Sequence, residues 1–221
     1  MKKEYVIEGV LPALGQLNAM LKNVMAKMQI DDPNEAIRRI NSGEWTVIAR
    51  IRQWTEENGV ISFNVISDGL TGPERIVRLE SKGFRVGDAA RFILNSTQYQ
   101  PTKAGTVHRV KVLKGELFSD SERSTEDIRA EAGKRNLTEL TAEVAGLIRE
   151  NFSDDELTYM GLGAIVVMHE PIKDSDDVLR FLGACSHDGG RWLFSYYYHT
   201  NACYKWRRGF GFAFGAEQVV S

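Results

Sequence analysis

The sequence predicts an α+β protein with a mainly antiparallel sheet, helices packed on that sheet, and an N-terminal amphipathic helix. Two observations support this class. Helix-like and strand-like segments come in clusters instead of alternating strictly, which is typical of α+β folds. Of the 221 residues, 43% are hydrophobic and 26% are charged, as in ordinary globular proteins. We expect an N-terminal helical segment over residues 1–43 and an α+β domain over residues 44–221.

The helical segment begins with a long apolar stripe. Over residues 10–30, apolar side chains recur at alternating spacings of 4 and 3, which keeps one face of a helix apolar. This helix either packs on its own domain or mediates self-association or binding of a partner protein. A second, shorter helix is expected from Pro33 to Asn41, ended by Gly43.

The domain opens with strands and then becomes helical. Two strand patterns, WTVIARI and GVISFNVISDG, flank the turn sequence EENG. The segment TGPERIVRLESKG predicts a helix, because Thr71 and Glu74 have capping-box spacing and Gly83 follows the apolar pattern. A short helix in GDAARFILNS and a strand in TVHRVKVLKGELF complete this part.

The second half of the domain repeats this mixture. The segments STEDIRAEAGKRN and LTAEVAGLIRENF have helical patterns, and Ser153 with Glu156 begins a third short helix that ends at Gly161. The segment GAIVVMHEP predicts a buried strand, and strand follows strand from Arg180 onward. The sequence on either side of DGG predicts a hairpin.

The run RRGFGFAFG near the C-terminus matches the first five positions of the strand with which RNA-recognition domains stack bases. In that motif the aromatic side chains face the bases, and the opposite face buries apolar side chains. Here the opposite face would hold glycines and Ala213, which bury almost nothing. We therefore expect Phe210, Phe212 and Phe214 to face the core.

Four residues of the tail resemble a set of zinc ligands: Cys185, His187, His199 and Cys203. The predicted hairpin places the first pair beside its turn and the second pair beyond the other end of the shared strand. The two pairs would then lie roughly 25 Å apart, at about 3.3 Å per strand residue. We therefore expect no metal site and no cofactor.

One candidate active site follows a buried strand. His169 and Glu170 stand at the end of that strand, Pro171 interrupts it, and Asp174 lies in the acidic loop beyond. A histidine with nearby carboxylates could perform general acid–base chemistry or hold a hard cation. The alternative is an ordinary strand end followed by a solvated acidic loop.

A candidate binding surface lies in the aromatic tail. Alternation along one strand places four aromatic residues on one face, as is typical of a half-buried strand: Trp192, Phe194, Tyr196 and Tyr198. Tyr197 lies on the opposite face, with Arg191, Lys205 and Arg207 nearby in the sequence. A ring beside basic groups would suit a carboxylate, a phosphate or a nucleic-acid backbone.

Composition restricts the partners and the location. The formal net charge of -2 provides no overall field for nucleic acid, which we do not expect as a partner. No apolar stretch approaches the ~20 residues that span a bilayer, so we expect no membrane insertion. The chain has 2 cysteines and thus no disulfide framework, which favours a cytoplasmic protein.

Several phrases resemble a group of uncharacterised bacterial proteins, many of them from uncultured candidate phyla: VLKGELFSDSER, IRAEAGKRNLTE, EVAGLIRE, MGLGAIVVMHEPIKDSD and GRWL…GFAFG. The resemblance covers residues 44–221 and implies no reaction, cofactor or catalytic residue. Two hypotheses follow from the residues. The first is a non-catalytic binding or interaction protein that uses the N-terminal helix and the C-terminal aromatic sheet. The second is a small hydrolase or metal-dependent enzyme centred on the HEPIKDSDD loop.

Overall fold

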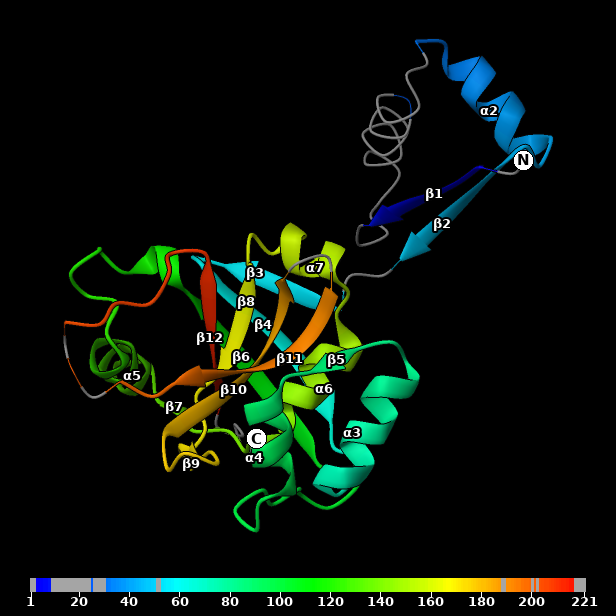
Figure 1. Cartoon of the computed structure of the whole chain (residues 1–221). Coiled ribbons are helices and arrows are strands. Elements are labelled where there is room, and N and C mark those ends of the chain that lie inside the picture. The colour runs from blue at the N-terminus through cyan, green and yellow to red at the C-terminus, as the bar shows by residue number, and fades with distance from the viewer. Residues whose placement is uncertain are drawn as a thin grey trace. The chain divides into compact units, whose positions relative to one another are not determined.

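A computed structural model describes the chain at residues 3–8, 25, 31–50, 53–187, 190–199, 201 and 203–216 (Figure 1). The chain divides into two compact units, Met1–Gln53 and Trp54–Ser221. Most of the predicted helix over residues 10–30 falls outside the described residues, and only Met25 is described there, as helical.

The first unit contains a pair of parallel strands and a helix. Strand β1 (Lys3–Glu8) pairs with β2 (Trp45–Arg50). Helix α2 (Pro33–Asn41) confirms the prediction for this segment. Sequence patterns predict β2 but not its partner β1, since the pairing joins residues about 40 positions apart and leaves no local signal.

The second unit is built on a 10-stranded sheet with the order β3-β4-β6-β12-β8-β10-β11-β5, and β7 and β9 pair at its side with β12 and β10. The strands are β3 (Trp54–Glu57), β4 (Val60–Ile66), β5 (Arg85–Val86), β6 (Val107–Lys114), β7 (Leu137–Thr138), β8 (Ala164–Val167), β9 (Ile172–Lys173), β10 (Leu179–His187), β11 (Gly190–Tyr197) and β12 (Phe210–Ala216). Most neighbours are antiparallel, but β8 with β12 and β5 with β11 are parallel. The sheet is therefore mixed and mainly antiparallel.

One predicted strand pairing is wrong. The strand that precedes the EENG turn and pairs with β4 is β3, whereas WTVIAR forms β2 and pairs with β1. The turn itself explains this, because Asn58 and Gly59 both have positive φ, 50° and 74°. Such a two-residue turn joins strands that begin directly on either side of it.

The helices of the second unit follow their sequence signals. They are α3 (Gly72–Ser81), α4 (Asp88–Asn95), α5 (Thr125–Lys134), α6 (Glu143–Asn151) and α7 (Asp154–Tyr159), with a 3₁₀ turn at Gly115–Leu117. The Glu74 carboxylate accepts hydrogen bonds from the Thr71 N–H and hydroxyl, at 2.8 and 2.7 Å, as its capping-box spacing predicts. A similar box, with Ser153 and Glu156, begins α7.

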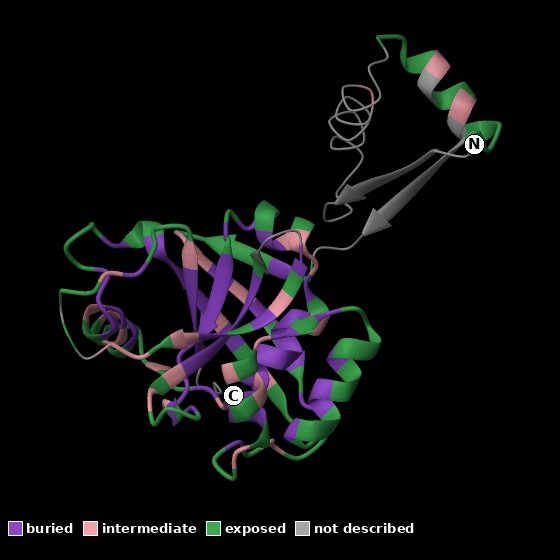
Figure 2. Cartoon of the chain, viewed as in Figure 1, coloured by how far each residue is buried: buried purple, intermediate pink, exposed green. Residues whose placement is uncertain are grey.

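The sheet carries a hydrophobic core on each face, because successive residues of a strand point to opposite sides. Ile165 and Ala213 belong to the larger core, which includes side chains of α3, α4, α6 and α7. Val166 and Phe212 belong to the smaller core, which includes α5 side chains. In Figure 1, α3 and α6 lie to the right of the sheet and α5 to the left. Figure 2 shows that the central strands are largely buried.

The strand β12 confirms the expected orientation of the phenylalanines. Phe212 and Phe214 are buried in the smaller core, and Phe210 is partly buried against it. The opposite face of β12 needs its glycines. A Cβ atom at Gly211 would lie 2.5 Å from a Val112 methyl group and 2.8 Å from a Leu162 methyl group.

The aromatic strand β11 has the predicted alternation, but its fully buried face is the other one. Leu193 and Ser195 are buried, whereas Phe194 is 41% exposed. Strand β5 pairs with only two residues of β11, so β11 lies close to the sheet edge. The larger core covers Leu193, while the aromatic face of β11 stays partly open to solvent.

Candidate functional site

The predicted catalytic residue His169 lies inside the protein. Its side chain is buried, with 1% of the residue exposed. The ring Nε2 accepts a hydrogen bond from the Leu182 N–H at 2.9 Å, so the proton resides on Nδ1, which donates to the Glu170 carbonyl at 2.6 Å. Burial lowers the pKa of His169 to about 4, and the Arg129 guanidinium acts in the same direction. Both nitrogens are thus engaged with the backbone.

The other two predicted catalytic residues, Glu170 and Asp174, have different surroundings. Glu170 is exposed. The Asp174 carboxylate is buried, accepts from the Asp176 and Val178 N–H groups, and pairs with Arg180 at 2.6 Å. Burial alone would raise the pKa of Asp174, but these donors hold it below its usual value. Asp174 therefore organises its own loop.

Two of the four predicted binding residues, Arg191 and Tyr197, lie near opposite ends of β11. Ser186 pairs with Arg191 and Arg180 pairs with Tyr197 in the hairpin, which separates Arg191 from Tyr197 by roughly 20 Å at about 3.3 Å per residue. Their contacts also differ: Arg191 lies 4.7 Å from the Phe84 ring, Arg180 lies 3.6 Å from the Tyr197 ring, Lys205 lies 3.5 Å from Asp127, and Arg207 lies 6.0 Å from the Phe210 ring.

The hairpin that the sequence predicts around DGG is present, with Gly190 already paired to His187 in the ladder. Cys185 pairs with Trp192 close to the turn, whereas His199 follows the opposite end of β11. Cys185 is buried and Cys203 is exposed. Among the described residues, no three His, Cys, Asp or Glu side chains are grouped as metal ligands would be.

A cleft of about 460 Å³ lies between α5 and the segment that follows β11. We call it the α5 cleft. Its walls include polar and titratable side chains from both elements: Thr125, Glu126, Arg129, Tyr198, His199 and Asn201. A carboxylate, a guanidinium, an imidazole, a phenol and an amide thus share one concave site.

The helix wall of the cleft is anchored at several points. The Trp206 indole donates to the Thr125 hydroxyl at 3.1 Å, which ties the start of α5 to the C-terminal segment. Arg129 forms an ion pair with Glu139 and donates to the His169 carbonyl at 3.2 Å. The Arg129 guanidinium also lies 5.7 Å from the Phe181 ring. Arg129 is therefore held in place before any ligand binds.

The opposite wall is an aromatic stack. The His199 ring stacks on Tyr204 with centroids 3.5 Å apart, and the Tyr197 ring lies 5.5 Å from His199. Burial lowers the pKa of His199, and the nearby Arg180 charge lowers it further. His199 thus favours the neutral form at neutral pH, which can donate one hydrogen bond and accept another.

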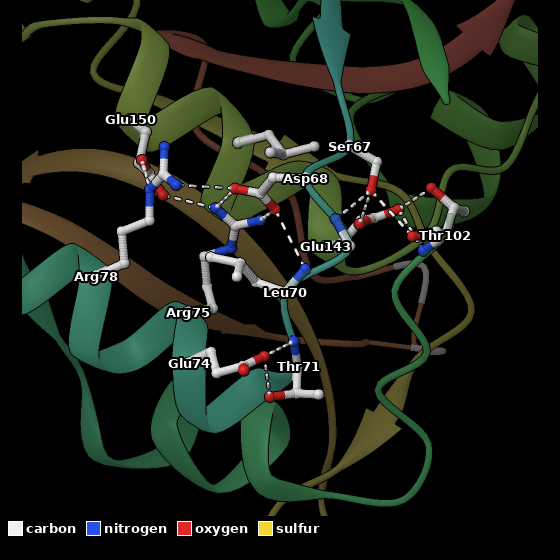
Figure 3. A network of polar contacts seen from close by, with 12 residues as sticks. Ser67, Asp68, Leu70, Thr71, Glu74, Arg75, Arg78, Thr102, Glu143 and Glu150 are labelled. Atoms are coloured by element: carbon white, nitrogen blue, oxygen red, sulfur yellow. Dashed lines mark hydrogen bonds and ion pairs between the residues drawn. The ribbon is translucent and has the colours of Figure 1, made fainter. Parts of the chain in front are cut away.

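A second polar group lies on the other face of the sheet, around Glu143 at the start of α6 (Figure 3). The buried carboxylate accepts from the Thr102 N–H and hydroxyl at 2.8 and 2.6 Å, and from the Ser67 hydroxyl at 2.8 Å. His108 Nε2 lies 3.1 Å from it. Burial alone would raise the pKa of Glu143, but His108, Thr102 and Ser67 lower it to about 2. Each carboxylate oxygen is already bonded, so this group locks two loops onto α6.

Buried charges extend this group towards α3. The fully buried Arg75 pairs with Asp68 and with Glu150, the latter at 2.6 Å (Figure 3). Glu150 also accepts from Arg78 at 2.8 Å. Gly146 leaves room for the Arg75 side chain, because a Cβ atom at position 146 would lie 2.9 Å from it. The network joins α3 to α6, while Arg75 Nε has no hydrogen-bond partner among the described residues.

Sequence reasoning missed most of the cleft residues. Glu126 and Arg129 share a helix face because they are three residues apart, and this spacing is the only local signal. The sequence places Tyr198 on an aromatic strand face and suggests His199 only as a zinc ligand. His108 lies beside Glu143 on the other face of the sheet.

Comparisons with protein-family models, curated proteins and solved structures found no match. Within the described part of the chain, no helix combines the length and apolarity that crossing a bilayer requires. The function must therefore be argued from the site.

Proposed function

We propose that this protein is a non-catalytic binding protein and that its α5 cleft receives a small polar ligand. The observation that carries the proposal is the convergence of Glu126, Arg129 and His199 in one cavity of about 460 Å³. A cavity of this size is within the range of small-molecule sites.

The competing enzyme hypothesis has less support. His169 uses both ring nitrogens in backbone hydrogen bonds, and the Asp174 carboxylate pairs with Arg180. A general base needs a nitrogen or oxygen that can reach a substrate proton. In the α5 cleft, His199 Nε2 is buried and, within the described residues, has no carboxylate partner to orient it.

The proposal is tested by filling the cleft. Ala130→Trp places a large ring in it, and Val77→Trp is the matched control, because Val77 is 67% exposed on α3 and belongs to the other face of the sheet. NMR spectra are recorded with a panel of amino acids, carboxylates, phosphates and amines. We expect some compounds to shift the Tyr198 and His199 signals in the wild type and Val77→Trp, but not in Ala130→Trp. A panel that shifts no cleft signal contradicts the proposal.

The proposal also covers the N-terminal segment and the location of the protein. We infer a bacterial, cytoplasmic protein that self-associates or binds a partner protein through residues 10–30, and does not bind nucleic acid. The regular apolar spacing of that segment and the low net charge support this. Deletion of residues 1–30 should lower the number of chains per particle, which light scattering gives as the measured mass divided by the mass of one chain. An unchanged number contradicts self-association.

A further inference from the structure

We propose that a second cavity of this protein binds a small zwitterion, a molecule that carries both an ammonium and a carboxylate group. The cavity has a volume of about 370 Å³ and lies beside the turn between β3 and β4; we call it the β4 pocket. It shares no lining residue with the α5 cleft, so the inference goes beyond the proposed function. Two observations carry it: the arrangement of the pocket walls and two opposite charges that line the pocket without pairing.

The walls of the β4 pocket come from three strands and from the segment after α5. Glu57 of β3 pairs with Val60 of β4, and Ser62 of β4 pairs with Lys111 of β6. Directly paired residues point to the same side of a sheet, and Val60 and Ser62 are two positions apart, so these four side chains share one face. Val60 and Leu137 pack against the smaller core and give the pocket an apolar lining.

The pocket contains one negative and one positive group that do not pair with each other. Lys111 Nζ donates to the Ser62 hydroxyl at 2.8 Å, which uses one of its three protons. Among the residues that the structure describes, Lys111 has no carboxylate partner and Glu57 has no cationic one. Strand β4 separates them, and their Cα atoms lie roughly 12 Å apart, at about 4.8 Å between strands and about 3.3 Å per residue. A ligand in the pocket could supply the opposite charge that each of them lacks.

The same two strands also carry a closed ion pair, on the other face of the sheet. Lys114 of β6 lies 3.0 Å from the Glu56 carboxylate of β3. Side chains of these strands can therefore meet across β4, whereas Glu57 and Lys111 leave a cavity between them. Glu57 is exposed and Lys111 is half-buried, so a ligand can reach both from solvent.

The balance of charge determines the class of ligand. Arg135 also lines the pocket, but it pairs with Glu131 at 2.8 Å. The unpaired charges are then one carboxylate, Glu57, and one ammonium, Lys111. A simple anion is repelled by the first and a simple cation by the second, whereas a zwitterion offers each of them the opposite charge. The apolar lining suits the carbon chain between the two charged ends.

The experiment compares zwitterions with singly charged molecules by NMR and calorimetry. The probes are 4-aminobutyrate, butyrate without the ammonium group and butylammonium without the carboxylate, together with glycine, whose two charges share one carbon. They are titrated into the wild type, Glu57→Gln, Lys111→Gln and Arg109→Gln. Arg109→Gln is the matched control, because Arg109 lies on the same strand and face as Lys111, is exposed and does not line the pocket. Physiological ionic strength screens its charge beyond about 8 Å.

We expect 4-aminobutyrate or glycine to shift the signals of Ser62 and Leu137, and to bind more tightly than butyrate and butylammonium. Glu57→Gln and Lys111→Gln should each weaken the binding of the zwitterion about three- to fivefold, the effect of losing one accessible ion pair. Glu57→Gln should weaken butylammonium but not butyrate, and Lys111→Gln should do the reverse. Arg109→Gln should leave all four affinities unchanged.

Other results overturn the inference. If butyrate or butylammonium binds as tightly as the better zwitterion, only one of the two charges contacts the ligand. Binding of a zwitterion that is insensitive to Glu57→Gln or to Lys111→Gln contradicts the inference as well. Probes that shift the Tyr198 and His199 signals, but not those of Ser62 and Leu137, support the proposed function and refute the β4 pocket. If no probe shifts a Ser62 or Leu137 signal, the inference fails, and the proposed function still stands or falls by its own test.

Discussion

The two faces of the sheet bury polar groups in different ways. On the face covered by α3 and α6, the Glu143 carboxylate accepts bonds from Ser67 and Thr102, and Arg75 has carboxylate partners. On the face covered by α5, Arg129 and His199 keep buried nitrogens without partners in the described part of the chain. Buried donors without a partner occur on both faces, since Arg75 Nε and Arg149 Nε also lack one among the described residues. The contrast therefore lies in Glu143, whose buried carboxylate is bonded at both oxygens, whereas the polar groups of the α5 cleft line a concave surface.

The largest effect is expected from Glu143. Replacing it by Gln keeps its size but removes the charge and one acceptor, which leaves a buried donor of Thr102 or Ser67 unpaired. We expect the free energy of unfolding to fall by about 3 kcal/mol. Urea denaturation measures it. Glu126→Gln is the matched control, since Glu126 is also in the first turn of a helix but exposed, and should change stability by less than about 0.5 kcal/mol. If both substitutions lower the free energy of unfolding equally, Glu143 is no more important for stability than the exposed Glu126.

The pH dependence of stability tests the burial of His169. Its pKa is about 4 in the folded protein, below the ordinary histidine value of 6.5 that the unfolded chain retains. Below pH 6.5 the unfolded chain therefore binds a proton that the folded protein does not. The free energy of unfolding should fall as pH drops from 6.5 to 4, by up to about 3 kcal/mol, and this contribution should vanish above pH 6.5. His169→Gln should flatten the slope in this window, and an unchanged slope would show that His169 is accessible to water.

Two helix glycines, one on each face of the sheet, differ in how much space surrounds them. Gly146 of α6 lies against Arg75, whereas a Cβ atom at Gly133 of α5 would meet nothing within 4 Å. Gly146→Ala should lower the free energy of unfolding by about 1–3 kcal/mol, because Arg75 cannot move without losing its partners. Gly133→Ala should raise it by up to about 1 kcal/mol through helix propensity. Thermal denaturation of both variants decides this, and a stabilised Gly146→Ala would show that Arg75 has room to shift.

The smallest effect is expected in the α5 cleft itself. His199→Phe removes a buried nitrogen that has no partner and keeps the ring against Tyr204. The free energy of unfolding should stay constant or rise by about 1 kcal/mol, because no hydrogen bond of the described protein is lost. Urea denaturation without added anions measures it. A clear loss of stability would mean that His199 already has an essential partner, and would weaken the case for a binding site.

Local patterns were sufficient for much of the fold. Thr71 with Glu74 and Ser153 with Glu156 locate helix starts, since both partners of a capping box lie within four residues. The turn between β10 and β11 is equally local, and Phe212 reaches the core as its alternation predicts. The partners of Glu143 could not be found this way, because Thr102 and Ser67 lie 41 and 76 residues away.

By itself, the sequence determined the class of the fold, the bounds of most helices, the hairpin and the inward face of β12. These features depend on periodicity, caps and turns, whose physical causes act over a few residues. The tertiary structure alone decided the parallel pairing of β8 with β12, the burial of His169 and the gathering of Arg129 and His199 into one cleft. These features depend on which distant segments pack together. The free energy that favours one packing arrangement comes from contacts throughout the chain, so no single segment predicts it.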